Sequence, residues 1–349
     1  MNGNVTKEGI TADLEAMAEI GLGGAQIFDA GCNIPPGPVA YNSPEWFDVI
    51  RHAAAEARRL GIELCLPNCS GWSSSGGPWN PPENGMKFLD WTETKVSGPA
   101  TYSARLPQPP NNHGFYEDIA VLAIPTPAAE QDTMLKAGVD VSNPSPDCGK
   151  KGGSVSVFTF AKPYAASGFS CRFQFGHTWS AAGDVRVEIS DDGRTFRPFT
   201  KQRVQLAASG GSDKGLRFIA FPKTVSAKAF RLTFDMPSHL KVQVRDLALS
   251  RRAAISDLAA KTFKVRTPVT VSVVETTPDQ VVAKGAPVDL TGRMAKDGSL
   301  TWDVPAGDWT IVRLGYAANG RCNHPASDHG RGPEVDKLSK KAMDFHFDA

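Results

Sequence analysis

The sequence predicts an α/β fold interrupted by all-β modules: a partial (β/α)8 barrel into which a β-sandwich of the jelly-roll type is inserted. Residues 1–92 repeat a pattern of helix, glycine and apolar strand, residues 93–320 change to short alternating runs between turn residues, and residues 321–349 return to a strand-and-helix pattern. An α/β domain that stops and later resumes is typical of an insertion in an exposed loop of a host fold. We therefore assign 1–92 and 321–349 to the barrel, 93–265 to the inserted sandwich and 266–320 to a further β segment.

Two helix-to-strand units are expected in the first segment. In "TADLEAMAEIG", Thr11 is the predicted N-cap and Gly21 the predicted end of a helix, and "GGAQIF" follows as a short strand. In "SPEWFDVIRHAAAEARRLG", Ser43 caps a second helix with Pro44 at its first position, and the helix ends at Gly61 before the strand "IELCL". Apolar strands joined by helices indicate a parallel sheet. Only about four of the eight units of a barrel can be placed, so we expect a fragment clipped at both ends.

Short strands with turn signals dominate the middle of the chain. Asp192-Gly193, between the alternating runs "VRVEIS" and "TFRPF", predicts a hairpin turn. A second β stretch runs from "PVTVSVVE" to "GSLTWDVPAGDWTIVRLGY". In the last segment, "GRGPEVDKLSKKAMDFHFDA" predicts a short strand that ends near Glu334 to Asp336, followed by a helix.

The composition argues against several classes of partner. The chain has 349 residues and a formal net charge of +1, so no bulk field attracts nucleic acid or an anionic membrane surface. No run approaches the ~20 apolar residues of a membrane span, and the first residues lack the pattern of a signal peptide. The six cysteines form no CxxC pair, so neither a zinc site nor a disulfide framework is indicated. The redox compartment is left open.

The stretch "NCSGWSSSGGPWN", residues 68–80, follows the strand "IELCL" and is too rich in glycine and hydroxyls to be core. A phosphate-binding loop would require a lysine after its glycines, and a GxSxG nucleophile elbow fails because Ser75 stands where the second glycine should be. Two interpretations remain. The loop binds carbohydrate, with tryptophan faces against sugar C–H groups and hydroxyls on sugar hydroxyls, or its tryptophans pack locally beneath a turn-rich loop.

Polar side chains also follow the other predicted strand ends. They are Asn2, Asn4, Asp29, Asn68, Glu334 and Asp336. Because barrel enzymes build their sites at the C-terminal ends of strands, these amides and carboxylates are expected to converge around the tryptophans, which suits glycoside chemistry. The alternative for Asp29 and Asp336 is a helix cap or a surface charge.

Several longer motifs carry a family resemblance. "WSSSGGPW", "GGAQIFD", "FYEDIAVLAIP", "LTWDVPAGDWTI" and the "NHPAS" and "EVDKLS" region, in this order over nearly the whole chain, resemble the bacterial α-L-rhamnosidases of glycoside hydrolase family 106. The resemblance implies a large multidomain enzyme with an interrupted barrel, a rhamnose-containing substrate, inversion by glutamate catalysts and an active-site calcium. It also implies a periplasmic or extracellular location, with a signal peptide upstream. The stretch "VRVEISDDGRTFRPF" is similar to galactose-binding or discoidin-type sandwiches, which are either sugar-binding or structural.

Inversion requires one carboxylic acid to protonate the glycosidic oxygen and a second carboxylate to activate water, roughly 6.5–9.5 Å apart. Glu334 is the candidate for one of them, preferably the acid. Asp336 could raise the pKa of that acid, hold the calcium or pair with Lys337, and His324 either bonds sugar hydroxyls or is an ordinary loop histidine. The expected substrate-binding residues are Asn2, Asp29, Asn68, Ser70, Trp72, Trp79, His324 and Asp336. A non-catalytic carbohydrate-binding protein or an inactive fragment is the alternative function.

Overall fold

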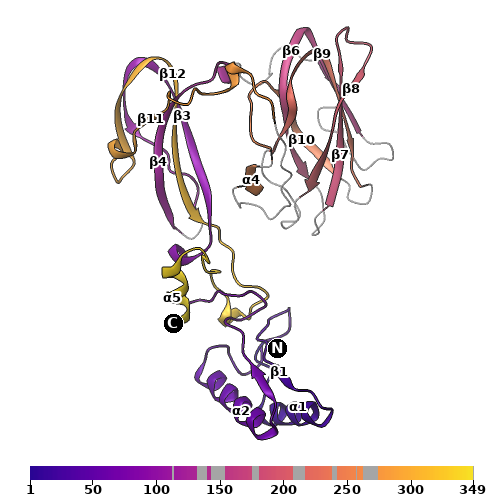
Figure 1. The fold of residues 1–349 in the computed structure, drawn as a ribbon, viewed down its shortest axis with the longest axis vertical. Coiled ribbons are helices and arrows are strands. Elements are labelled where there is room, and N and C mark those ends of the chain that lie inside the picture. The colour runs from indigo at the N-terminus through magenta and orange to yellow at the C-terminus, as the bar shows by residue number, and fades with distance from the viewer. Residues whose placement is uncertain are drawn as a thin grey trace. The chain divides into compact units, whose positions relative to one another are not determined.

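The computed structural model describes residues 1–111, 114–131, 140–142, 154–174, 181–206, 217–237, 242–256, 258–261 and 274–348. The chain forms two compact units (Figure 1). The first unit contains Met1–Phe88, Pro110–Glu117 and Tyr316–Ala349, and the second contains Leu89–Pro109 and Asp118–Gly315. Across the described residues, no helix is long and apolar enough to cross a membrane.

The first unit begins with helix α1, Lys7–Glu19. The prediction that Thr11 caps this helix is wrong, because Thr6 has the extended backbone of an N-cap and its side chain accepts a hydrogen bond from the Gly9 amide at 3.0 Å. Thr11 lies inside the helix, where its hydroxyl is 2.9 Å from His52 Nε2. The helix is followed by Gly21, whose left-handed φ of +82° reverses the chain toward the first strand.

Helix α2, Pro44–Leu60, has the predicted boundaries. The Ser43 hydroxyl accepts from the Trp46 amide at 3.1 Å, and Gly61 ends the helix in the left-handed conformation, with φ 72°. Val49, Ala53 and Ala57 are its buried residues. Their spacing places them on one helix face, and the sequence signals for both ends of α2 are confirmed. The apolar face expected from Phe47 and Ala54 is wrong, because both of these side chains are exposed.

Strands β1, Gly24–Gln26, and β2, Glu63–Cys65, pair in parallel, with Ala25 opposite Leu64. They form a two-stranded sheet that gains no further strand within the described part of the chain. The prediction of a partial (β/α)8 barrel is therefore wrong. The helix-to-strand rhythm correctly indicated one parallel pair, but the later segments pair antiparallel with one another and do not extend this sheet.

The C-terminal part of the first unit contains short 3₁₀ turns at Pro82–Asn84 (η1) and Asp328–Gly330 (η5) and ends with helix α5, Lys340–Asp348. The strand predicted near Glu334 is reduced to isolated antiparallel bridges, which join Gly85 to Val335 and Cys322 to Pro333. The segment therefore crosses the loop that follows β2 and adds nothing to the β1–β2 sheet.

A four-stranded sheet has the order β11-β4-β12-β3. Its strands are β3 (Lys87–Arg105), β4 (Tyr116–Pro125), β11 (Val288–Asp289) and β12 (Ser299–Ala318), with the 3₁₀ turn Thr291–Arg293 (η4) after β11. Side-chain hydrogen bonds from Ser97 to Asp308 and from Thr101 to Asp303 show that β3 and β12 run antiparallel. The Arg313 side chain, only 5% exposed, donates from Nε and Nη2 to the two carboxylate oxygens of Asp118.

A β-sandwich forms the remainder of the second unit. Its strands are β5 (Asp140–Ser142), β6 (Ser154–Gln174), β7 (Ala181–Ser190), β8 (Arg197–Leu206), β9 (Arg217–Asp235) and β10 (Gln243–Ser250). The pairing order is β10-β6-β9-β7-β8, with β5 on β6. The first half of β6 pairs with the end of β9, and its second half pairs with the start of β9 and with β10. The register shifts between these halves let both long strands bend from one layer into the other.

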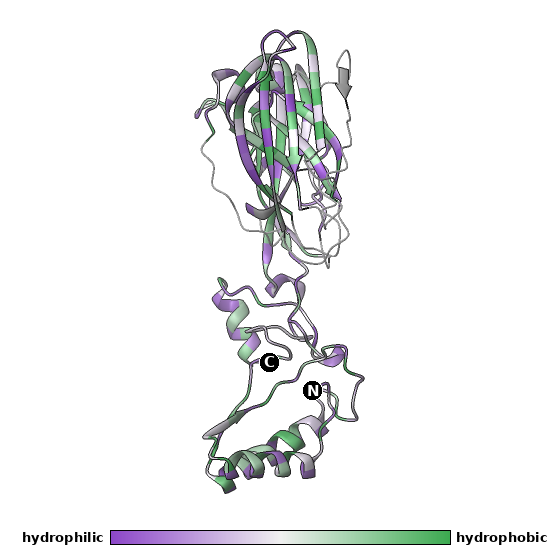
Figure 2. Cartoon of the chain, turned by 90° about the vertical axis from the view of Figure 1, so that its right-hand side faces the viewer, coloured by the Kyte–Doolittle hydropathy of each residue, from purple (hydrophilic) through white to green (hydrophobic). Residues whose placement is uncertain are grey.

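Six fully buried phenylalanines fill the sandwich: Phe158, Phe169, Phe173, Phe221, Phe230 and Phe234. Hydrophobic and hydrophilic bands alternate along its strands in Figure 2, as expected for strands with one face on a core. The predicted hairpin at Asp192-Gly193 is confirmed. β7 and β8 pair antiparallel around it, and Asp192 Oδ1 accepts from the amides of Arg194 and Thr195. Most of the predicted strand "PVTVSVVE" lies outside the described residues.

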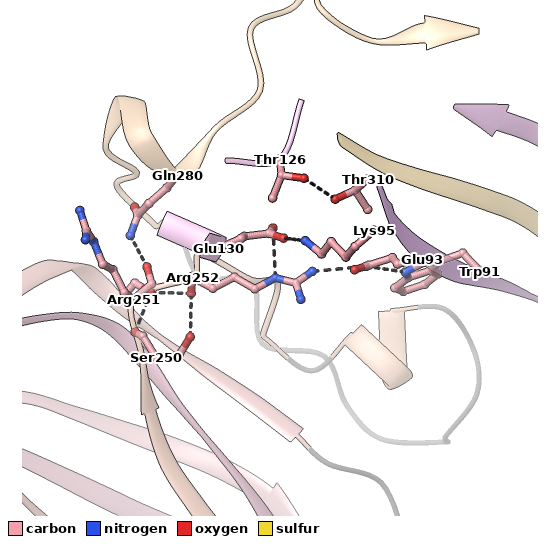
Figure 3. Close-up of polar contacts among 11 residues, drawn as sticks. Trp91, Glu93, Lys95, Thr126, Glu130, Ser250, Arg251, Arg252, Gln280 and Thr310 are labelled. Carbon is pink, nitrogen blue, oxygen red and sulfur yellow. Dashed lines mark hydrogen bonds and ion pairs between the residues drawn. The ribbon is translucent and has the colours of Figure 1, made fainter. Parts of the chain in front are cut away.

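Charged residues link the sandwich to the four-stranded sheet inside the second unit (Figure 3). Arg252, which follows β10, pairs with Glu130 at 3.2 Å and with Glu93 on β3 at 3.3 Å, and Lys95 pairs with Glu130 at 2.9 Å. Glu130 lies on the short helix α3, Ala128–Gln131. The short helix α4, Leu258–Lys261, and the 3₁₀ turn η3, Pro278–Gln280, complete the connection.

Candidate functional site

Asp29 joins three chain segments of the first unit. It follows β1, and its side chain is 8% exposed. One carboxylate oxygen, Oδ2, accepts hydrogen bonds from the hydroxyls of Ser70 and, at 2.6 Å, of Ser327. The Asp29 carbonyl accepts from the Gly71 amide at 2.6 Å, and the Ser327 amide donates to Ser70 Oγ at 3.0 Å. We call Asp29, Ser70 and Ser327 the Asp29 hub.

Asn323 brackets the hub, and its role was not predicted from the sequence. Its side-chain amide donates to the carbonyls of Ser70 at 2.7 Å and Gly330 at 2.9 Å, and its Oδ1 accepts from the Gly332 amide at 2.9 Å. The residue is 1% exposed. The sequence signal for Asn323 and Ser327 was the motif "CNHPAS", in which both residues lie close to His324.

Close backbone approach explains the glycines of this region. Gly71 has φ +86°, and a Cβ at this position would lie 2.8 Å from the carbonyl carbon of His324. A Cβ on Gly330 would collide with the side chain of Ser70. The loop after β2, residues 68–80, and the segment 321–334 therefore pack backbone against backbone.

Trp72 and His324 expose their side chains while their backbones are fixed. The Trp72 amide donates to the His324 carbonyl at 3.0 Å, and the His324 amide donates to Ser73 Oγ at 3.1 Å. The Trp72 side chain is 64% exposed, and His324 is also exposed. These two predicted binding residues are brought together next to the hub, and they are available to a ligand.

The second tryptophan, Trp79, is bound within the protein. Its Nε1 donates to Nδ1 of His346 on α5 at 3.1 Å, so its polar group already has a partner. The Asn2 side chain donates to the Ile34 carbonyl at 2.6 Å and fastens a neighbouring loop. Asn4 does the same at the Pro35 carbonyl. Asn68 is exposed at the start of the Trp72 loop.

Glu334 and Asp336 each have an ammonium partner. Glu334 Oε1 lies 2.9 Å from Lys337 Nζ, and Asp336 Oδ2 lies 3.0 Å from Lys87 Nζ. Asp336 Oδ1 also accepts from the Leu338 amide at 3.1 Å, so both of its oxygens hold the chain in place. The Glu334 side chain is 20% exposed and retains a second oxygen for a ligand or a water.

Two acidic groups of the site, the Cys69 thiol and the Tyr41 hydroxyl, have raised pKa values. Burial, with a smaller contribution from the negative charge of Glu334, raises the pKa of the Cys69 thiol to about 11. Burial also raises the pKa of Tyr41 to about 12, with smaller contributions from Cys69 and Asp29. Both groups are therefore neutral at physiological pH, and the Cys69 thiol donates to the Ser73 carbonyl at 3.0 Å. Neither group is a nucleophile in this state.

A cavity of about 230 Å³ lies on the other side of Asp29, between α1, α2 and the β1–β2 pair. Its lining is mostly aliphatic, with Leu14, Val49 and Leu64 among its walls. Sugar sites require several hydroxyl partners in addition to an aromatic face, so the polar surface around Trp72 fits a sugar better than this cavity does.

The expected calcium ion finds no complete site among the described residues. Calcium takes six to eight oxygen ligands, commonly including several carboxylates. No three His, Cys, Asp or Glu side chains gather into a possible metal site within the described part of the chain. Asp336, which was a candidate calcium ligand, is paired with Lys87, and the nearby Glu334 is paired with Lys337. The calcium ion stays a prediction.

A family model, a solved structure and a curated protein each match the whole chain. The model of glycoside hydrolase family 106, described as alpha-L-rhamnosidase, matches residues 1–349. The solved structure of a rhamnosidase from Novosphingobium sp. PP1Y is 28% identical, has a TM-score of 0.74, and is matched over 100% of this chain and 35% of that chain. A Formosa agariphila protein with the provisional name beta-glucuronidase is 29% identical over 348 residues, which are 100% of this chain and 20% of that protein. The chain thus spans about a third and a fifth of these relatives.

The Asp29 hub leads to a stability prediction. Asp29→Ala leaves two buried hydroxyls without their acceptor, so the free energy of unfolding of the first unit should fall by about 2–4 kcal/mol. Asp29→Asn keeps one acceptor oxygen and should lose about half as much. Urea unfolding, combined with hydrogen exchange of peptides from 68–77 and 321–333, measures both the loss and its location. The exposed Asp328→Ala is the matched control, and an equal loss in Asp29→Ala and Asp328→Ala would contradict the hub.

Proposed function

Since the chain belongs to glycoside hydrolase family 106, the alpha-L-rhamnosidase family, we propose that the protein that carries it hydrolyses terminal α-L-rhamnosides. The match of the family over residues 1–349 is the observation that carries the proposal. The likeness to a solved rhamnosidase, also over the whole chain, supports it. Rhamnosides of plant-derived glycans are the substrate class we favour, and we keep the periplasm or the cell exterior as the predicted location.

For substrate binding we propose the exposed face of the loop after β2. Trp72 offers an indole face that is 64% exposed on a fixed backbone, and such faces bind the C–H surfaces of sugars. Rhamnose is a 6-deoxy sugar, so its C5 methyl group adds an apolar contact that an indole suits. His324, Asn68 and Ser74 are exposed near Trp72 in the fold or the sequence and would bond the sugar hydroxyls.

For catalysis we propose inversion, with Glu334 as one of the two carboxylates. Inversion places an acid and a base on opposite faces of the sugar, so that water attacks as the leaving oxygen is protonated. The sequence favoured the acid for Glu334. Glu334 Oε1 lies 2.9 Å from the ammonium of Lys337, and the second carboxylate oxygen is left for the glycosidic oxygen or a water. We keep the acid as the proposed role of Glu334.

The proposed function leads first to a prediction about the reaction itself. The full-length protein should release nitrophenol from 4-nitrophenyl α-L-rhamnoside, and NMR should detect β-L-rhamnose as the first product, as inversion requires. The control substrate is 4-nitrophenyl β-D-glucuronide, because one relative has a provisional name as a glucuronidase. Turnover of the glucuronide without turnover of the rhamnoside would refute the substrate and leave the class of hydrolase standing.

The second prediction concerns Glu334. In the full-length protein, Glu334→Gln should lower kcat by about 10²–10⁴ with KM nearly unchanged, because it removes proton transfer and preserves shape. Two controls are matched to it. The exposed Glu83→Gln should have wild-type kinetics, and Lys337→Met keeps the carboxylate and should reduce kcat by no more than about tenfold. A Glu334→Gln enzyme with wild-type kcat would show that this carboxylate is structural, and that the protein binds sugar through this surface without using Glu334 for chemistry.

The third prediction concerns Trp72. Trp72→Ala should raise KM by about 3- to 10-fold, since an aromatic contact contributes about 0.5–1.5 kcal/mol beyond burial, and should leave kcat nearly unchanged. Its exposed side chain contributes little to folding, so the urea midpoint should not move. Leu338→Ala, which truncates a side chain that is 99% exposed, is the control for loss of surface apolar area. An unchanged KM in Trp72→Ala would remove Trp72 from the binding surface.

A further inference from the structure

His346 is a buried histidine in the first unit that the proposed chemistry does not use. It lies on α5 and is 5% exposed. Its Nδ1 is 3.1 Å from Trp79 Nε1 and 3.2 Å from Asn80 Nδ2. Trp79 and His346 have nearly parallel rings, at 18° with centroids 5.8 Å apart. One imidazole therefore holds the end of the loop 68–80.

These contacts define one protonation state. An indole N–H only donates, so Nδ1 must accept the bond from Trp79, and the Asn80 amide must donate to the same nitrogen. The proton of the neutral ring is then on Nε2. A protonated imidazolium has no acceptor, so it would lose both donors at Nδ1.

An alternative arrangement for the protonated ring is also present. Asn80 is 2% exposed, and its Oδ1 is a buried oxygen without a hydrogen-bond partner. If the Asn80 amide rotates, Oδ1 can accept from an Nδ1–H of His346. Its Nδ2 would then leave the Pro333 carbonyl, 3.4 Å away, and the Trp79 indole would have no acceptor. The two protonation states thus favour two different arrangements of Trp79 and Asn80.

We propose that neutral His346 is the positioning residue of the loop 68–80, and that its protonation releases the Trp79 end of this loop. The consequence for the reaction rests on the proposed function. Gly76 and Gly77 lie between Trp79 and the hub, and a Cβ on Gly76 would be 3.3 Å from the Cα of Glu334. Release at Trp79 therefore loosens the segment that packs on Glu334, while Ser70 stays bound to Asp29.

The direction of the pH effect follows from the surroundings of His346. Burial lowers its pKa from the ordinary value of 6.5, the Asn68 backbone offsets part of this, and the positive charge of Lys337 adds a smaller lowering. Lys337 in turn faces Glu334, and α5 itself carries Lys340, Lys341, Asp344 and Asp348, all exposed. Because the pKa is depressed in the folded state, the neutral ring stabilises the fold in full above pH 6.5. The stabilisation is lost as the pH falls through the folded pKa.

The test uses full-length protein labelled with 5-fluorotryptophan. The ¹⁹F resonance of Trp79 is the one that is missing in Trp79→Phe. We expect it to shift between pH 8 and pH 5 with a midpoint below about 6.5, and to lose this shift in His346→Gln, which does not titrate. The exposed His329→Gln is the matched control and should keep the shift. A pH-independent Trp79 resonance in the wild-type protein, or the same shift in His346→Gln, would overturn the proposal.

A second variant keeps the test decisive if His346→Gln does not fold. Asn80→Asp is nearly isosteric and places a carboxylate at Nδ1, so the midpoint of the Trp79 shift should rise by about one pH unit or more. An unchanged or lowered midpoint would refute the role of Asn80.

Kinetics separate this proposal from the proposed function. For 4-nitrophenyl α-L-rhamnoside, the wild-type kcat/KM should fall on acidification through the range in which Trp79 shifts, and His346→Gln should lack that limb of the profile. Identical profiles would overturn the positioning role. If the wild-type protein hydrolyses no rhamnoside, the proposed function fails, and the fluorine titration alone decides the proposal for His346.

Discussion

The arrangement of the candidate site depends on one buried carboxylate. Asp29 Oδ2 accepts hydroxyl donors from Ser70 and from Ser327, which is 298 residues away in the sequence. A carboxylate that is removed from water is expensive unless it is hydrogen-bonded, so the three segments are stable mainly when they are together. Asn323 extends the same logic to the backbone, because its amide group satisfies carbonyls of Ser70 and Gly330. Buried hydrogen bonds thus hold the segments of the site together, whereas apolar packing holds the strands of the sandwich together.

This construction gives the loop after β2 an inner and an outer face. Cys69, Ser70 and Ser75 are buried, and the Ser70 hydroxyl contacts Ser327, while Trp72 is exposed. The exposed indole therefore stands on a backbone that is fixed on its inner side. A binding face that is ordered before the ligand arrives loses less conformational entropy on binding. The glycines of the loop contribute to this order, since only a residue without a side chain allows the backbone of the loop to approach the segment 321–334 so closely.

Local signals in the sequence predicted local structure well. Ser43, Pro44 and Gly61 mark both ends of α2, and Asp192-Gly193 marks a hairpin, because each acts on its own neighbours. Closure of a barrel is a non-local property, and the helix-to-strand rhythm specifies only the β1–β2 pair. The site divides in the same way. Polar residues after the strands were predicted, but the partners of Asp29 and of Trp79 lie more than two hundred residues away, at Ser327 and His346, and only the tertiary structure reveals them.

Lys337 couples the two ends of the proposed site through charge. It pairs with Glu334 at 2.9 Å, and it also disfavours the protonated form of His346. The same ammonium thus contacts the proposed catalytic carboxylate and adds to the burial that keeps the His346 ring neutral. The loop is held at Trp79 in the pH range in which the His346 ring is neutral, above its lowered pKa. In that range Trp79 and Asn80 are bonded to His346 and the segment at Gly76 packs on Glu334, and protonation of the ring on acidification removes this support.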